Sequence, residues 1–359
     1  MGSIGSDEKT CYVTLVTKDS YIPGVVILSH TLDKHGSKYP FLVQYTESLG
    51  DHGVRILENE AKRAGRIVPV KVDLLLPRAG MENKGSVAER FKDTFTKLRA
   101  FEVYKNGFTR ACFLDADMAV FQNPDTIFDT KMPRDWIACN HSCVCNLDHD
   151  SWAPDAWQKG NCAYTTLTSP DQIAHDTSSR PTYGLLNGGL FMFYPSEELW
   201  TQMMGFFNYT ERLKEYQFPD QDFFADFFRN KWQPVSWKYN AIKTMRYWHP
   251  QMWSDDVLVI LHYIVDKPWE RQVSPKGVGG YLGRDGTTHR WWWDIYSSWL
   301  ETQKENTETL GVMRKLVDTK APLTEVVPLP QEPGRPEDVK PYEELLSWSQ
   351  ANRNGAHVQ

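Results

Sequence analysis

The chain has 359 residues, of which 41% are hydrophobic and 24% charged, and its formal net charge is −6. This length and composition predict one or two folded domains and exclude a disordered or collagen-like chain. The pI of about 6.0 argues against a generally basic nucleic-acid binder. Because no 18 apolar residues follow one another and Met1–Thr10 lacks the apolar core of a secretory signal, we expect no transmembrane segment and a cytoplasmic location.

Strand-like and helix-like patterns alternate through the first third of the chain. Short apolar, β-branched runs predict strands over residues 11–17, 41–45, 67–72 and 111–114. Apolar residues at helical spacing predict helices over residues 22–32, 54–64 and 91–101. This alternation predicts an α/β fold in which a Rossmann-like, mostly parallel central sheet is flanked by helices.

The second half of the chain is less regular. Residues 136–182 show little periodicity and are rich in Cys, Asn, Asp, Trp and Pro, which favours a loop insertion on the acceptor side of a site. Strands are then predicted over 189–194 and 257–261, and helices over 196–207, 220–228 and 289–293. We expect residues 1–300 to form the main domain and residues 301–359 a helical, then Pro-rich, C-terminal extension.

The sharpest chemical signal is the segment from Phe113 to Asp117, which reads F-L-D-A-D. Asp115 and Asp117 leave the carboxyl end of a predicted buried strand, the end at which open α/β sheets bind ligands. Two neighbouring carboxylates suit Mg²⁺ or Mn²⁺ bound together with a phosphate. Two enzyme classes use this device: phosphatases with an aspartate nucleophile of the haloacid dehalogenase type, and nucleotide-sugar glycosyltransferases of the GT-A fold.

Further motifs appear in one order between Tyr12 and Trp269, and together they resemble glycosyltransferase family 8, which includes glycogenin and galactinol synthase. The motifs are Thr14–Tyr21, Thr96–Leu98, Asp115–Asp117, Leu186–Phe191, Phe218–Asp222, and His262 with Lys267–Trp269. Each motif alone has an ordinary structural explanation, such as a turn, a helix cap or a packed histidine. The resemblance depends on their common order.

The resemblance implies a GT-A fold and a retaining hexosyltransferase that uses a UDP-sugar and Mn²⁺ or Mg²⁺. It implies that Asp115, Asp117 and His262 hold the metal, and that Asp220, Gln221 and Asp222 lie at the reacting face of the donor sugar. The donor contacts it implies are Leu15, Thr17, Tyr21, Lys97, Ala116, Asn187, Gly188 and Lys267. Among these, Tyr21 is expected to stack on uracil and Lys267 to bind the pyrophosphate.

The resemblance leaves the substrates open. UDP-glucose, UDP-galactose and UDP-N-acetylglucosamine are all candidate donors, and a polyol, a sugar or another small hydroxyl compound is a candidate acceptor. We expect no nucleic-acid partner, and a homodimer is possible.

A cluster of thiols and imidazoles in the irregular region offers a different interpretation. Its members are Cys139, His141, Cys143, Cys145, His149 and Cys162. They could form a zinc site, and the protein would then be a non-catalytic interaction protein on a transferase scaffold. Because C-x-C is not the usual zinc-knuckle spacing, we favour reduced buried or loop thiols. Aromatic and polar residues of this region are candidates for the acceptor pocket, namely Trp152, Asp155, Trp157, Trp248, His249 and Trp253.

Overall fold

The computed structural model describes residues 9–81, 93–174, 180–182, 184–303 and 306–330. Most of the N-terminal segment considered above, the start of the helix predicted from residue 91, and the Pro-rich tail beyond residue 330 lie outside these ranges. Within them, no helix combines the length and the apolar character needed to cross a membrane.

A seven-stranded sheet in the order β3-β2-β1-β4-β7-β6-β8 forms the centre of the fold. Its strands are β1 (Thr10–Val16), β2 (Phe41–Tyr45), β3 (Ile67–Lys71), β4 (Arg110–Leu114), β6 (Ile137–His141), β7 (Leu186–Phe193) and β8 (Trp232–Pro234). Neighbouring strands are parallel except on the two sides of β7, which runs antiparallel to β4 and β6. The structure thus confirms the predicted mixed, mostly parallel sheet.

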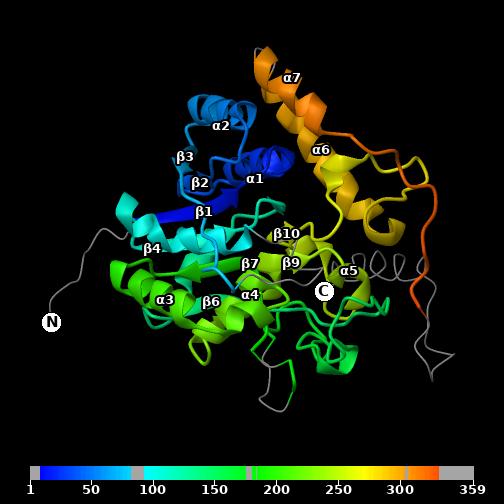
Figure 1. Cartoon of the computed structure of the whole chain (residues 1–359). Coiled ribbons are helices and arrows are strands. Elements are labelled where there is room, and N and C mark those ends of the chain that lie inside the picture. The colour runs from blue at the N-terminus through cyan, green and yellow to red at the C-terminus, as the bar shows by residue number, and fades with distance from the viewer. Residues whose placement is uncertain (1–8, 82–92, 175–179, 183, 304–305, 331–359) are drawn as a thin grey trace, which may run out of the picture.

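Side chains of the central strands alternate between two cores, as the period of two along a strand requires. In β1, Tyr12 and Val16 face one core while Cys11 and Val13 face the other. The first core is covered by α1 (Ile22–Lys34) and α2 (Asp51–Ala64), with α6 (Gly286–Thr302) and α7 (Thr307–Leu316) beside them (Figure 1).

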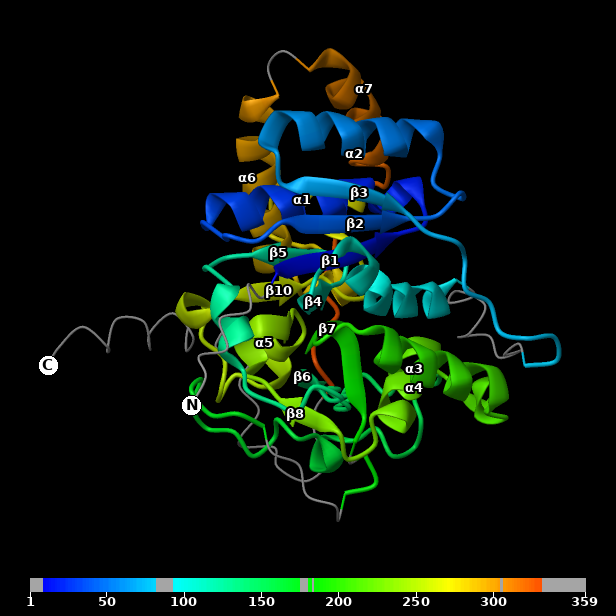
Figure 2. The same cartoon turned by 90° about the vertical axis from the view of Figure 1, so that its left-hand side faces the viewer.

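The second core is rich in phenylalanine and lies under three other helices. They are the 3₁₀ helix η3 (Thr94–Asn106), α3 (Glu197–Tyr209) and α4 (Pro219–Phe227), and Figure 2 shows α3 and α4 beside β7. Phe113 of β4 and Phe191 of β7 stack there with ring centroids 4.9 Å apart. Helices therefore cover both faces of the sheet.

A smaller three-stranded sheet, in the order β5-β10-β9, lies beyond the end of β4. Its strands are β5 (Met118–Val120), β9 (Ala241–Ile242) and β10 (Ile260–His262). Short helices connect this part of the chain, among them α5 (Met245–Trp248), η7 (Trp237–Asn240) and η9 (Pro268–Glu270). Because β10 pairs with β5, this sheet brings His262 next to the D-x-D segment.

The structure corrects three of the predicted elements. Residues 137–141, placed in the irregular insertion, form β6 inside the central sheet, and only the residues after it are irregular. Its sequence, IACNH, hides a fully buried strand because polar residues interrupt the apolar run. The strand predicted over 257–261 is a 3₁₀ turn at Asp255–Val257 followed by β10, and the helix predicted from residue 91 is the 3₁₀ helix η3.

The C-terminal part of the described chain packs against the rest of the molecule. The expected boundary at residue 300 falls inside α6, and α7 contacts α1 and α2. After α7 the described chain has no regular structure, but its backbone is held in place. Val327 N donates to Leu282 O (2.9 Å), and the buried Arg284 donates to Val327 O (2.6 Å).

Candidate active site

Strand pairing brings the D-x-D segment and His262 together. β4 ends at Leu114, and the chain turns through Asp115–Asp117 into β5. β5 pairs antiparallel with β10, so that Met118 faces His262, and Tyr263 N donates to Asp117 O at 2.9 Å. Two segments that are far apart in the sequence therefore present their polar side chains at the carboxyl end of β4.

Three potential metal ligands lie at this point. One ligand atom from each of Asp115, Asp117 and His262 lies within 4.8 Å of the others. His262 Nε2 is 3.2 Å from Asp117 Oδ1 and 3.7 Å from Asp115 Oδ2. Ligand atoms of one octahedral Mg²⁺ are separated by about 3 Å in adjacent and about 4.2 Å in opposite positions, so the set has the right dimensions. Two carboxylates and one imidazole also suit Mn²⁺.

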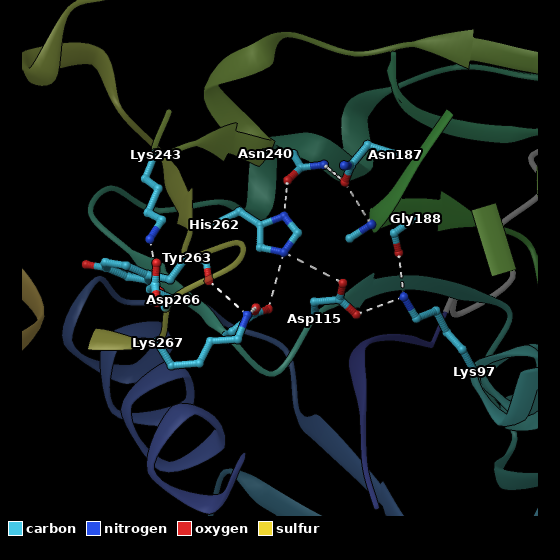
Figure 3. Close-up of polar contacts among 12 residues, drawn as sticks. Lys97, Asp115, Asn187, Gly188, Asn240, Lys243, His262, Tyr263, Asp266 and Lys267 are labelled. Atoms are coloured by element: carbon cyan, nitrogen blue, oxygen red, sulfur yellow. Dashed lines mark hydrogen bonds and ion pairs between the residues drawn. The ribbon is translucent and has the colours of Figure 1, made fainter. Parts of the chain in front are cut away.

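A hydrogen-bond chain orients the imidazole and selects its tautomer (Figure 3). Gly189 N donates to Asn187 Oδ1 at 3.0 Å, so the amide oxygen of Asn187 is fixed. Asn240 Nδ2 donates to the same oxygen at 2.8 Å, which turns Asn240 Oδ1 toward His262 Nδ1 at 2.9 Å. Because Oδ1 can only accept, Nδ1 carries a proton, and Nε2 is the ring nitrogen that faces the two carboxylates.

Lys97 connects the D-x-D segment to α4. Its Nζ lies 3.0 Å from Asp115 Oδ1 and 2.6 Å from Asp220 Oδ2, and it donates to Gly188 O at 3.1 Å. Burial alone would lower the pKa of Lys97, but Asp115 and Asp220 outweigh it and raise the pKa above its usual value. Lys97 therefore stays charged between the buried Asp220 carboxylate and the half-buried Asp115 carboxylate.

Lys267 pairs with Asp117, as Lys97 pairs with Asp115. Its Nζ forms an ion pair with Asp117 Oδ2, donates to Tyr263 O at 3.0 Å, and lies 5.7 Å from the centre of the Tyr21 ring. Burial would raise the pKa of Asp117, but Lys267 and His262 outweigh it and hold the pKa well below its ordinary value. Trp269 supports this corner, since its Nε1 donates to Ser20 O at 2.9 Å.

The pKa values of the two D-x-D carboxylates are shifted in opposite directions. Burial raises the pKa of Asp115, and the neighbouring Asp117 carboxylate adds to the shift, although Lys97 opposes it. A divalent cation would favour the ionised form of both groups.

The segment Asp220–Asp222 divides between two roles. Asp220 is buried against Lys97, and Gln221 Oε1 accepts from Gly188 N at 3.0 Å, so both adjoin the metal-ligand cluster through Lys97 and Gly188. Asp222 Oδ2 instead accepts from the backbone N–H groups of Gln217 (2.8 Å) and Phe218 (3.0 Å). It closes the first turn of α4.

The remaining expected donor contacts surround the cluster less closely. Ala116 is buried in the turn between the two aspartates, and its carbonyl lies against Gly24 of α1. Leu15 packs against the phenylalanine-rich core, and Thr17 Oγ1 donates to Asp93 at 2.5 Å. Leu15 and Thr17 therefore make no described contact with the ligand cluster. Other expected donor contacts reach it directly or through one neighbouring residue, namely Tyr21, Lys97, Asn187, Gly188 and Lys267.

The proposed acceptor-pocket residues do not form one pocket. The irregular region lines a cavity of about 820 Å³ whose walls include Asp155 and Trp157. His249 instead lies among three cysteine thiols, and Trp253 packs against Trp237 with ring centroids 4.9 Å apart.

Comparison with known proteins identifies the family. The profile of "Glycosyl transferase family 8" matches residues 12–273. The chain belongs to glycosyl transferase family 8. This membership does not favour the phosphatase or the non-catalytic interpretation.

Curated relatives and solved structures agree with this assignment. Galactinol synthase 1 of Solanum lycopersicum is 25% identical over 308 residues, which cover 84% of this chain and 86% of that protein. Galactinol synthase 6 of Arabidopsis thaliana is 27% identical, with 84% of each chain covered. The crystal structure of the galactosyltransferase LgtC, with donor and acceptor sugar analogs, superposes with a TM-score of 0.54 at 13% identity over 80% of this chain and 95% of LgtC. That likeness shows the GT-A fold.

Two residues that contact expected site residues escaped sequence analysis. Asn240 orients His262, but an asparagine at the end of a short 3₁₀ helix carries no signal of its own. Asp93 Oδ2 accepts a hydrogen bond from Thr17 Oγ1, and Asp93 Oδ1 lies 3.8 Å from Lys18 Nζ. Asn240 contacts the cluster itself, whereas the Asp93 carboxylate contacts the expected donor residue Thr17 and its neighbour. Both contacts span large sequence separations, which no local pattern reveals.

Proposed function

We propose that the protein is a retaining hexosyltransferase that moves a hexose from a UDP-sugar to a hydroxyl acceptor, and that Asp115, Asp117 and His262 hold a divalent cation on the pyrophosphate. The meeting of these three side chains at the carboxyl end of β4 carries the proposal. The cation would act as a Lewis acid that neutralises charge on the departing diphosphate. GT-A glycosyltransferases typically use such a metal with a nucleotide sugar.

In this proposal the chain's own cations and amides complete the donor site. Lys267, released from its ion pair with Asp117 when the metal binds, would contact the diphosphate oxygens. Tyr21, next to Lys267, would stack on the uracil ring. Asp220 and the Gln221 amide, which meet Lys97 and Gly188, would lie near the sugar carbon that becomes positively charged.

The names of the relatives indicate which donor and acceptor substrates to test first. Several are named galactinol synthases, so UDP-galactose is the first donor to test and polyols are the first acceptors. UDP-glucose and UDP-N-acetylglucosamine complete the donor panel.

The deciding experiment measures UDP release from each UDP-hexose with and without Mn²⁺, across a panel of polyol and sugar acceptors. We expect Mn²⁺-dependent UDP release that Asp117→Asn abolishes, and a product whose NMR spectrum shows the donor's anomeric configuration. Asp135→Asn is the matched control, because Asp135 is exposed and pairs only with the surface residue Lys231 among the described contacts. Metal-independent turnover, or inverted product, would contradict the proposal.

A further inference from the structure

A second group of potential metal ligands lies outside the site described above. Cys143 and Cys145 follow β6, Cys162 follows the short helix η5 (Lys159–Asn161), and His249 follows α5. The four residues are 9%, 2%, 0% and 0% exposed, in that order. Three segments of the chain therefore contribute thiols and an imidazole to one buried point.

The distances match a tetrahedral zinc site. His249 Nε2 lies 3.4, 3.1 and 3.5 Å from the sulfurs of Cys143, Cys145 and Cys162, and the sulfurs of Cys143 and Cys162 are 3.8 Å apart. With Zn–S near 2.3 Å and Zn–N near 2.0 Å, tetrahedral geometry requires about 3.5 Å for S···N and about 3.8 Å for S···S. A disulfide needs its sulfurs about 2.05 Å apart, so Cys143 and Cys162 are not bonded to each other.

The chemistry of the four ligands selects the metal. Three cysteines and one histidine form a closed structural zinc set with no position left for a substrate. Thiolates favour zinc over the harder Mn²⁺ and Mg²⁺, whereas the two carboxylates at Asp115 and Asp117 favour the harder ions. The two sites are therefore expected to take different metals.

A metal bound by the three cysteines and His249 would stabilise the surrounding irregular region. In the described part of residues 142–185 the only regular element is η5. Few backbone hydrogen bonds of helices or strands therefore stabilise this region. A four-ligand ion would tie it to the ends of β6 and α5. The same region carries Trp157, which stacks on Phe218 with ring centroids 5.2 Å apart. Phe218 directly precedes α4, which holds Asp220 and Gln221.

We propose that Cys143, Cys145, Cys162 and His249 bind a structural zinc ion that fixes the irregular region after β6 against α5 and the start of α4. This differs from the cysteine–histidine set considered from the sequence, since Cys139 is not a member and His249 replaces His141 and His149 as the imidazole ligand. It also differs from a non-catalytic interpretation, because the zinc is additional to the transferase site.

The test uses the full chain, purified without a metal-affinity step. After dialysis against EDTA, elemental analysis should find about one zinc per chain, and Asp117→Asn should retain it. Cys162→Ser should lose most of the zinc, while Cys139→Ser should keep it. Cys139 is the matched control because it is also buried, lies in β6, and is not a member of the cluster.

Measurements on the unsubstituted protein guard against a variant that fails to fold. A mercurial thiol reagent should release the zinc, as detected with a chromogenic chelator. Cobalt exchanged into the site should give the intense thiolate and tetrahedral absorption bands of a sulfur-ligated ion. Protein that binds no zinc even when supplied with it, zinc that disappears with Asp117→Asn, or equal loss in Cys139→Ser and Cys162→Ser would overturn the proposal.

Discussion

The backbone of Gly189 lies against the imidazole of His262, so close that a Cβ atom at position 189 would lie 2.6 Å from Nδ1. Only glycine leaves the ring in its present place, because real Cβ atoms do not approach other atoms within 3 Å. We therefore expect Gly189→Ala to displace His262 and to weaken Mn²⁺ binding by about 10- to 100-fold, the usual effect of disturbing a ligand's support. Titration with Mn²⁺ in the presence of UDP measures the change.

Gly205→Ala serves as the control for this substitution. Gly205 lies inside α3, where an added Cβ atom would meet no neighbouring atom of the described chain within 4 Å. Alanine there should leave Mn²⁺ affinity unchanged and raise the free energy of unfolding by about 0.5–1 kcal/mol, because alanine favours the helix. Equal Mn²⁺ affinity in both variants would contradict the role assigned to the close approach.

Asn240 is expected to act on the metal only through His262. Asn240→Leu removes the acceptor for His262 Nδ1 and the donor to Asn187 Oδ1. Metal affinity should fall about 10- to 100-fold, since the imidazole loses its fixed tautomer and orientation. Asn240→Asp keeps the acceptor and should lose less affinity than the leucine variant. Calorimetric Mn²⁺ titrations of both variants test this order, and an aspartate variant that loses as much affinity as the leucine variant would contradict it.

Lys97 is expected to stabilise the metal-free protein strongly. Lys97→Met leaves the buried Asp220 and the half-buried Asp115 without their shared cation. Breaking a buried pair in this way costs about 3 to 5 kcal/mol of unfolding free energy. Lys105→Met, in the same helix η3, removes an exposed cation that pairs with Glu102 and lies over the Tyr104 ring, and should cost less than about 1 kcal/mol. Urea unfolding in EDTA compares the two, and equal losses would count against the role of Lys97.

His289 is expected to make stability depend on pH. It is fully buried in α6 with Nε2 3.2 Å from Lys243 Nζ, and burial, together with Lys243, lowers its pKa well below the ordinary value. Below about pH 6.5 the unfolded chain binds a proton that the folded chain resists, so stability falls as the pH falls. The slope from this group is about 1.4 kcal/mol per pH unit.

The measurement compares the unsubstituted protein with His289→Gln between pH 5.5 and pH 7.5. Glutamine cannot titrate but keeps an acceptor for Lys243, so the pH dependence of its unfolding free energy should be flatter below pH 6.5. The other titrating groups are common to both proteins and largely cancel in the comparison. Identical profiles would show that the pKa of His289 is the same in the folded and the unfolded chain, which would contradict this prediction.

Local sequence patterns determined much of the fold. The alternation of β-branched runs and helical repeats placed β1, β2, α1 and α2 within a few residues of their observed bounds. The same patterns failed where the local signal was mixed. Polar residues within β6 hid a buried central strand, and the strand near residue 260 begins later than the apolar run suggested.

The sequence by itself determined that two carboxylates follow a buried strand, because Asp115 and Asp117 are fixed by the chain that immediately precedes them. The family resemblance implied that His262 joins them, but only the tertiary structure brings its imidazole to the two carboxylates. The antiparallel register of β5 and β10 places His262 beside Asp117, and the meeting of β6, η5 and α5 places His249 among three thiols. Such encounters depend on pairing between distant segments, whose closure is driven by burial of the whole core rather than by any short stretch of residues.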